Sequence, residues 1–322
     1  MESKLLYQNL SDQLKLRIPQ NSQLVAKLVD ILSLERMAVY RRLRQEVPFS
    51  FEEVVTIAKE FKISLDNMLG IDARTTHPFR FQSIEGKSPV EIDYDLLEDY
   101  MQTIKKIAAN PCGKISLITN LLPQSFCAEF ISIFRFYYFK WRYYSLPADR
   151  TKSYHEIELP DRLIQIAKDT FTNLKNIKTG CYILDNQILQ KFINDVSYFN
   201  SIRLIRNEDL LLIKEELLKF LDYMEIIATN GFADNPSNKV CIYISETSID
   251  TSYCYIESPN SCRFALILSF IFNSVLTFEE ETLKMMKNWI RSKIRTSTLL
   301  SVTGEKNRTL YFDTQRKTIE QF

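Results

Sequence analysis

The sequence predicts a mainly α protein with an α+β C-terminal part, divided into a small N-terminal bundle of helices and a larger α+β module. Three observations predict this class. Short stretches with helical spacing of apolar residues fill residues 1–70, longer helical stretches dominate the middle of the chain, and β-branched and aromatic runs follow residue 235. With 322 residues, of which 45% are hydrophobic and 25% charged, the chain is long enough for two domains or one large one.

The N-terminal helices are delimited by breakers and capping residues. Asn21 or Ser22 can cap the second helix, because a short polar side chain accepts hydrogen bonds from the free backbone N–H groups of a first turn. Ser50 and Glu53 match a capping box, in which each side chain accepts from the backbone N–H of the other residue. The five predicted helices cover about 4–18, 22–32, 36–45, 51–61 and 64–69.

Residues 71–92 are predicted to be a linker. This stretch contains His77-Pro78, Gly86 and Ser88-Pro89, and it has little sustained periodicity. The predicted domains are therefore 1–70, a unit of short helices, and 93–322, the α+β module.

The α+β module is predicted to combine helices with several strands. Helices are expected at about 93–109 and 124–144, in two or three segments between 160 and 227, and after a capping box at Thr277 and Glu280. Strands are expected at about 114–121, 181–184, 240–245, 252–257 and 263–270, followed after the last helix by a strand or turn segment. The helix at 124–144 carries aromatic residues on nearly every side, which favours a core and subunit-interface role over a platform for single-stranded bases.

Composition excludes several classes of protein. The six glycines are too far apart for a phosphate-binding glycine-rich loop. The chain has only two histidines, His77 and His155, which are few for a zinc site or for acid–base catalysis by histidine. We therefore expect no enzyme activity, no cofactor and no metal. No apolar run is long enough for a membrane span, no signal peptide is evident, and the six cysteines contain no C-x-x-C pair, so we expect a cytoplasmic protein without membrane association.

The third predicted helix carries the most informative chemistry. At 100° per residue, Val39, Tyr40 and Leu43 share one face, whereas Ala38, Arg41, Arg42 and Gln45 lie opposite. Such a helix fits the DNA major groove, where arginine pairs with guanine or phosphate and glutamine pairs with adenine, and where a small Ala38 allows close approach. Because the net charge of the whole chain is only +1, any electrostatic function must be local.

Residues 22–70 resemble a lambda-repressor-like helix-turn-helix domain. Ser22-Gln23-Leu24-Val25-Ala26-Lys27-Leu28 is similar to the start of the second helix of that family, and residues 51–69 follow its two closing helices. The stretch Ala38-Val39-Tyr40-Arg41-Arg42-Leu43-Arg44 resembles the recognition helix of the BetR-like regulators. The turn at residues 30–34 lacks the glycine that the family usually carries. The resemblance implies that Gln23 contacts a DNA phosphate, and that Arg36 and the outward arginines contact the major groove.

These observations favour a sequence-specific, DNA-binding transcriptional regulator. Its candidate DNA-binding residues are Gln23, Arg36, Ala38, Tyr40, Arg41, Arg42, Arg44 and Gln45. Because one monomer offers few contacts, we expect a homodimer that forms through residues 93–322 and binds double-stranded DNA; the same module could hold a small-molecule or protein effector. The alternative is a protein-interaction adaptor that uses the helical domain and the aromatic helix. Steep weakening of binding by salt would favour DNA over an apolar protein partner.

Overall fold

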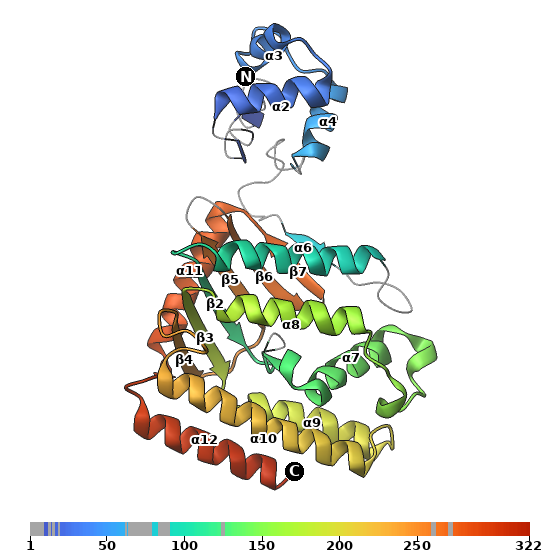
Figure 1. Cartoon of the computed structure of the whole chain (residues 1–322), viewed down its shortest axis with the longest axis vertical. Coiled ribbons are helices and arrows are strands. Elements are labelled where there is room, and N and C mark those ends of the chain that lie inside the picture. The colour runs from blue at the N-terminus through green and yellow to red at the C-terminus, as the bar shows by residue number, and fades with distance from the viewer. Residues whose placement is uncertain are drawn as a thin grey trace. The chain divides into compact units, whose positions relative to one another are not determined.

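The computed structural model describes residues 10, 11, 14, 17, 18, 20–61, 63, 79–82, 91–123, 126–258, 262–269 and 273–322. The chain divides into two compact units, Met1–Pro78 and Phe79–Phe322 (Figure 1). The division falls inside the segment 71–92 that the sequence predicts to be a linker. The predicted class is confirmed, since a helical N-terminal part precedes an α+β module.

The N-terminal unit is a bundle of short helices around a small apolar core. The described helices are α2 (Asn21–Leu32), α3 (Arg36–Leu43) and α4 (Phe51–Glu60). The core comprises Leu10, Leu14, Leu24, Val25, Leu28, Val39, Phe49, Ile57, Ala58, Phe61 and Ile63. Most of the predicted helix at 4–18, and all of the predicted turn at 64–69, lie outside the described residues.

The turn between α2 and α3 depends on a serine in the left-handed backbone region. Ser33 has φ 52° and ψ 39°, a conformation that glycine adopts without steric cost. Ser33 thus occupies the position of the glycine that this turn lacks. The capping expectation for α2 was wrong, because the N-cap residue is Gln20 rather than Asn21 or Ser22, and no side chain caps the helix.

The third helix ends two residues earlier than predicted. The amide of Gln45 donates to the carbonyl of Arg42, and the amide of Glu46 donates to the carbonyl of Arg41, both at 2.9 Å. With Gln45 at φ 63°, these two bonds form a Schellman motif that terminates α3 at Leu43. The next helix begins as predicted, with the reciprocal capping box of Ser50 and Glu53.

The second unit is built on an eight-stranded mixed sheet, as counted over the described residues, with the order β1-β7-β6-β5-β2-β3-β4-β8. Its strands are β1 (Arg80–Gln82), β2 (Lys114–Thr119), β3 (Thr179–Asp185), β4 (Lys239–Ser245), β5 (Tyr253–Ser258), β6 (Cys262–Ser269), β7 (Asn273–Thr277) and β8 (Ser297–Leu299). The centre, β2-β3-β4, is parallel, and every other pairing is antiparallel. Helical crossovers connect the parallel strands.

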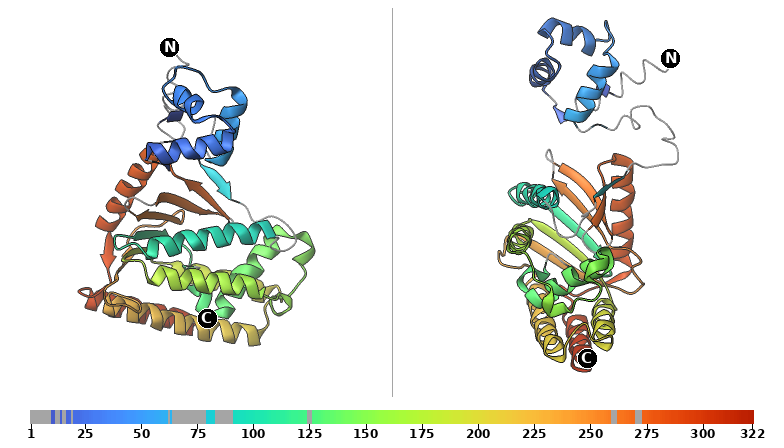
Figure 2. Two further views of the ribbon diagram at one scale, coloured as in Figure 1. Left: turned by 45° about the horizontal axis from the view of Figure 1, so that its top comes forward. Right: turned by 90° about the vertical axis from the view of Figure 1, so that its right-hand side faces the viewer.

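The two faces of this sheet are covered very differently. One face packs against α6 (Glu91–Ala108), α7 (Ile131–Ser145), α8 (Asp161–Lys175), α9 (Ile188–Ser201), α10 (Asn207–Asn230) and α12 (Glu305–Glu320). On the other face lies α11 (Glu280–Arg295), whose Leu283 and Ile290 pack on Ile118, Ile183 and Tyr255 of the strands. Figure 2 shows α11 on the side of the sheet opposite to α6 and α8.

The aromatic helix is part of the main core. Seven of its residues are buried, and its rings meet those of α9 edge to face, with centroids 5.0 Å apart for Phe136–Phe192 and for Phe139–Phe199. The helix begins at Ile131, after a 3₁₀ turn at Cys127–Glu129, rather than near residue 124. Its first amides are bound by Glu216 of α10, whose carboxylate accepts from Ser132 at 2.6 Å. Burial raises the pKa of Glu216.

Three further features differ from the predictions. The segment 71–92 is not linker throughout, because β1 pairs with β7 and α6 begins at Glu91. Thr277 does not cap α11, since the N-cap is Glu279, whose carboxylate accepts from the amides of Glu281 and Thr282. The C-terminal segment is a strand followed by the helix α12. No helix in the described part of the chain is long and apolar enough to cross a membrane.

We predict effects of different size for two substitutions at Ser33. Ser33→Gly keeps the left-handed turn at no steric cost and should change the stability of the N-terminal unit by less than about 0.5 kcal/mol. Ser33→Val places a β-branched residue at φ 52° and should cost about 1–2 kcal/mol. Hydrogen exchange of peptides from α2 and α3, measured by mass spectrometry in the full chain, reports both values. Equal exchange in the two variants would contradict this account of the turn.

Candidate nucleic-acid interface

The outward line of α3 consists of Met37, Arg41 and the C-cap residue Arg44. Val39 is fully buried, and Leu43, one turn later, packs on the same core. At 100° per residue, positions 37, 41 and 44 then point away from the core in a row along the helix. The exposed fraction of Met37 is 64%, and the side chains of Arg41 and Arg44 are 58% and 57% exposed. This row presents two cations and one apolar side chain to solvent.

The exposed arginines are held only weakly within the unit. The Nε atoms of Arg41 and Arg44 lie 3.7 and 3.0 Å from the carboxylate of Glu46, which is itself half exposed. Exposed ion pairs of this kind contribute about 0–1 kcal/mol, so the guanidinium groups can exchange Glu46 for a phosphate or a base edge. In the described part of the chain, Arg36 is exposed and makes no ion pair.

Arg42 does not lie on the outward face, which corrects the expectation from the helical pattern. Its Nε and Nη2 atoms each donate at 2.9 Å to one oxygen of Glu53 in α4, and the two side chains are only 17% and 16% exposed. The same Glu53 carboxylate accepts from the amide of Ser50 at 2.9 Å. One carboxylate therefore caps α4 and ties α3 to it.

The electrostatics of Glu53 follow from this geometry. Burial raises the pKa of the Glu53 carboxyl. Hydrogen bonds from Arg42 and from the Ser50 amide, together with the charge of Arg42, lower the pKa by more than burial raises it. The net pKa therefore lies below the usual value of 4.5. A lowered pKa in the folded state means that the carboxylate stabilises the unit above about pH 4.5. This contribution is lost as pH falls through the lowered pKa.

The remaining predicted residues fall into three environments. Tyr40 is half-buried against the core, and Ala38 is half-buried, with its carbonyl accepting from Arg42 at 3.4 Å. Gln45 lies beyond the end of α3 in the Schellman turn, so it does not share a helix face with Arg41, contrary to the prediction. Gln23 is exposed in the first turn of α2, where no acidic residue and no side-chain cap compete for an anion.

Sequence reasoning missed Met37. The position of a methionine four residues before Arg41 was the available signal, but an apolar residue next to an arginine cluster looks like a core residue in a single sequence. Its exposure in the structure identifies it as a candidate apolar contact for the methyl group of thymine.

Comparison with known families agrees with this arrangement of helices. Residues 2–135 match the BetR domain. The BetR domain is a helix-turn-helix regulator domain, so the resemblance seen in residues 22–70 is confirmed. No curated protein and no solved structure matches the chain.

The BetR match extends well beyond the N-terminal unit. It continues through β1, α6 and β2 and includes the first residues of α7. The matched segment thus contains the N-terminal helical unit and, in addition, a central strand of the sheet. The BetR domain as matched here does not coincide with one compact unit.

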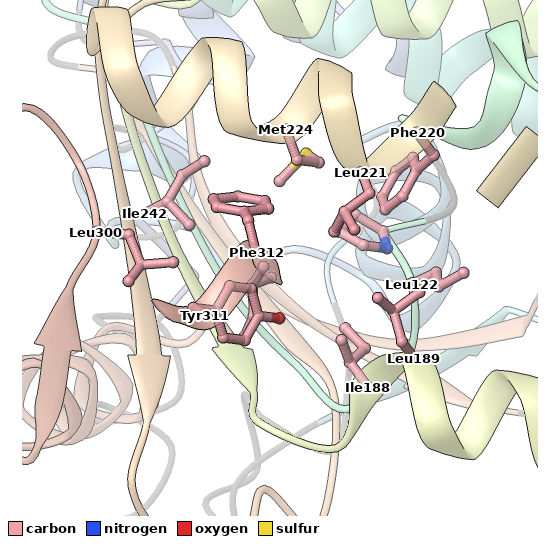
Figure 3. A pocket seen from close by; sticks show the side chains of 12 residues that line it. Leu122, Ile188, Leu189, Phe220, Leu221, Met224, Ile242, Leu300, Tyr311 and Phe312 are labelled. Carbon is pink, nitrogen blue, oxygen red and sulfur yellow. The ribbon is translucent and has the colours of Figure 1, made fainter. Parts of the chain in front are cut away.

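The second unit contains a small apolar cavity. It has a volume of about 20 Å³ and lies among α9, α10, α12 and β4, where Ile188, Met224, Ile242 and Phe312 contribute to its wall (Figure 3). A cavity of this size holds about one water-sized molecule. Burial raises the pKa of Tyr311, whose ring also lines the cavity.

We predict that Arg42→Ala destabilises the N-terminal helices of the BetR segment by about 1–3 kcal/mol, because it leaves a largely buried carboxylate without its cation. Arg41→Ala is the matched control and should change stability by less than about 0.5 kcal/mol. Hydrogen exchange of the α3 and α4 peptides measures both effects. Similar exchange in the two variants would show that Glu53 does not anchor α3.

Proposed function

We propose that this protein is a transcriptional regulator that binds double-stranded DNA sequence-specifically as a homodimer, with α3 in the major groove. One observation carries the proposal: α3 presents Met37, Arg41 and Arg44 outward while Arg42 and Val39 fix its opposite side. The helix-turn-helix nature of the matched domain supports it.

The residues divide into those that read bases and those that position the protein. Arg41, in the middle of the outward line, suits bidentate pairing with guanine, and Met37 suits contact with a thymine methyl group. Arg36, Arg44 and Gln23 suit phosphate contacts, which fix register but carry no sequence information. The uncapped first turn of α2 adds backbone amides that favour phosphate.

A dimer would supply the affinity that one helix lacks. A recognition helix of eight residues offers few contacts, and two copies reading half-sites about one helical turn apart multiply them. Five of the six cysteines are free thiols, which suits a reducing compartment such as the cytoplasm; these are Cys112, Cys127, Cys181, Cys241 and Cys254. The proposal assigns no catalytic step to this chain.

The contact surface expected for a protein-interaction adaptor is mostly buried. It relied on the aromatic helix, whose rings lie mostly in the core of the second unit. Steep weakening of duplex binding between low and moderate salt would separate DNA recognition from an apolar protein interface.

We predict that Arg41→Ala weakens binding to a duplex selected by the full chain from a random library by about tenfold or more, because a bidentate base contact contributes about 1–3 kcal/mol. Arg36→Ala should weaken binding to all duplexes alike and reduce the slope of log K against log salt by about one. Fluorescence anisotropy at fixed salt measures these effects. Wild-type affinity of the Arg41→Ala, Met37→Ala double variant would refute the assignment of α3 to the groove.

A further inference from the structure

Helix α11 exposes a row of cations on the face of the sheet that it covers. In the described part of the chain, no other helix contributes to the core on this face (Figure 2). At 100° per residue, Lys284, Arg291 and Arg295 lie in one line along the helix, to one side of the buried Ile290. All three side chains are exposed, and within the described residues none of them makes an ion pair or a hydrogen bond. The row therefore offers three unpaired positive charges to solvent.

The sheet adds two lysines to the same face. Ile118 of β2 and Tyr243 of β4 contribute to the core under α11. Lys114 and Lys239 each lie four residues earlier on these strands, so they point to the same side of the sheet. Both lysines are exposed. We call the five residues Lys114, Lys239, Lys284, Arg291 and Arg295 the basic surface.

Acidic side chains do not balance the basic surface. The Glu257 carboxylate of β5 lies 2.7 Å from the ammonium of Lys287 and 3.8 Å from that of Lys114, so two cations share it. Within the bounds of α11, Glu280 and Glu281 both lie in the first turn, where the helix dipole favours negative charge. Because the net charge of the whole chain is only +1, this excess of cations is a local feature.

The charge and length of the row favour a nucleic acid as its partner. Residues 284 to 295 span about 16 Å along the helix axis. A DNA duplex carries about one negative charge per 1.7 Å over the whole of such a length, whereas protein surfaces intersperse charges of both signs. A bilayer fits less well, because the apolar side of α11, with Leu283 and Ile290, is buried on the sheet and cannot insert as an interfacial helix does.

We infer that the basic surface of the second unit binds the phosphate backbone of a DNA duplex, independently of its sequence. Exposed lysine and arginine side chains make phosphate contacts, which add affinity but carry no information about bases. Helix α3 then supplies the base contacts, and the basic surface supplies affinity. The inference rests on the proposed function, because it takes the duplex of that function as its ligand.

Neutralising the row tests this surface in the full chain. The triple variant Lys284→Gln, Arg291→Gln, Arg295→Gln should bind a duplex selected by the wild-type chain about tenfold or more weakly at about 0.1 M salt. The slope of log K against log salt should fall by about two to three. The ratio of affinities for selected and scrambled duplexes should stay unchanged, because phosphate contacts carry no sequence information. Fluorescence anisotropy measures all three quantities.

A matched control has the same net charge as the triple variant. It replaces by glutamine three exposed lysines outside this face, Lys105 and Lys106 on α6 and Lys306 on α12. Its affinity and salt slope should stay near the wild-type values. Equal weakening in the two variants would reduce the effect to net charge and overturn the proposal. All exchanged side chains are exposed, so each variant should fold, which circular dichroism checks.

Photo-crosslinking locates the contact without removing a charge. Asn288 is exposed and lies in the same line of α11 as the three cations. A benzophenone amino acid at this position should cross-link to selected and scrambled duplexes alike, whereas the same amino acid in place of Leu310, exposed on α12, should not. A bound duplex without cross-links from position 288 overturns the proposal. Cross-links that form with polyglutamate or phosphatidylserine vesicles, but not with the duplex, overturn it as well.

The outcomes separate this inference from the proposed function. Suppose that the Arg41→Ala, Met37→Ala double variant loses selective binding while the triple variant of α11 binds like wild type. The basic surface is then refuted, and the function of α3 stands. If instead the triple variant loses duplex binding while the double variant binds like wild type, the assignment of α3 to the groove is refuted and the basic surface stands.

Discussion

The arrangement of the N-terminal unit depends on one bidentate ion pair, Arg42 with Glu53. Two hydrogen bonds of 2.9 Å in a partly buried site hold the guanidinium in a fixed orientation, and the same carboxylate closes the first turn of α4. Because α3 has only eight residues and few buried side chains, its own apolar contacts define its rotation poorly. The ion pair fixes that rotation, and with it the outward direction of Met37, Arg41 and Arg44.

The same reasoning explains why arginines within one short helix have different roles. Arg41 and Arg44 share an exposed carboxylate that water screens, so they stay available to an anionic partner. Arg42 is shielded from water, and its partner lies on another helix, so it acts within the fold. Arg36 lies at the start of α3, where the helix dipole favours anions.

The sequence alone predicts those elements whose structure depends on signals within a few residues. The Ser50–Glu53 capping box, the position of α3 and the central strands follow from signals within a few residues. The role of Arg42 could not be predicted, because its position on the helical wheel is intermediate and its partner is eleven residues away. The helix α12 was missed because Arg308 and Gln315 occupy its buried face, which hides the apolar period. The strand β1 is too short for a pattern.

The central claim is that the outward line of α3 lies against DNA bases. Photo-crosslinking tests it most directly, with a benzophenone amino acid at position 37 of the full chain bound to a duplex that the wild-type chain has selected. The account predicts cross-links from position 37 to the duplex, within the sequence that selection has enriched, and none from the same amino acid at position 310. A bound duplex that cross-links at position 310 but not at position 37 would contradict it.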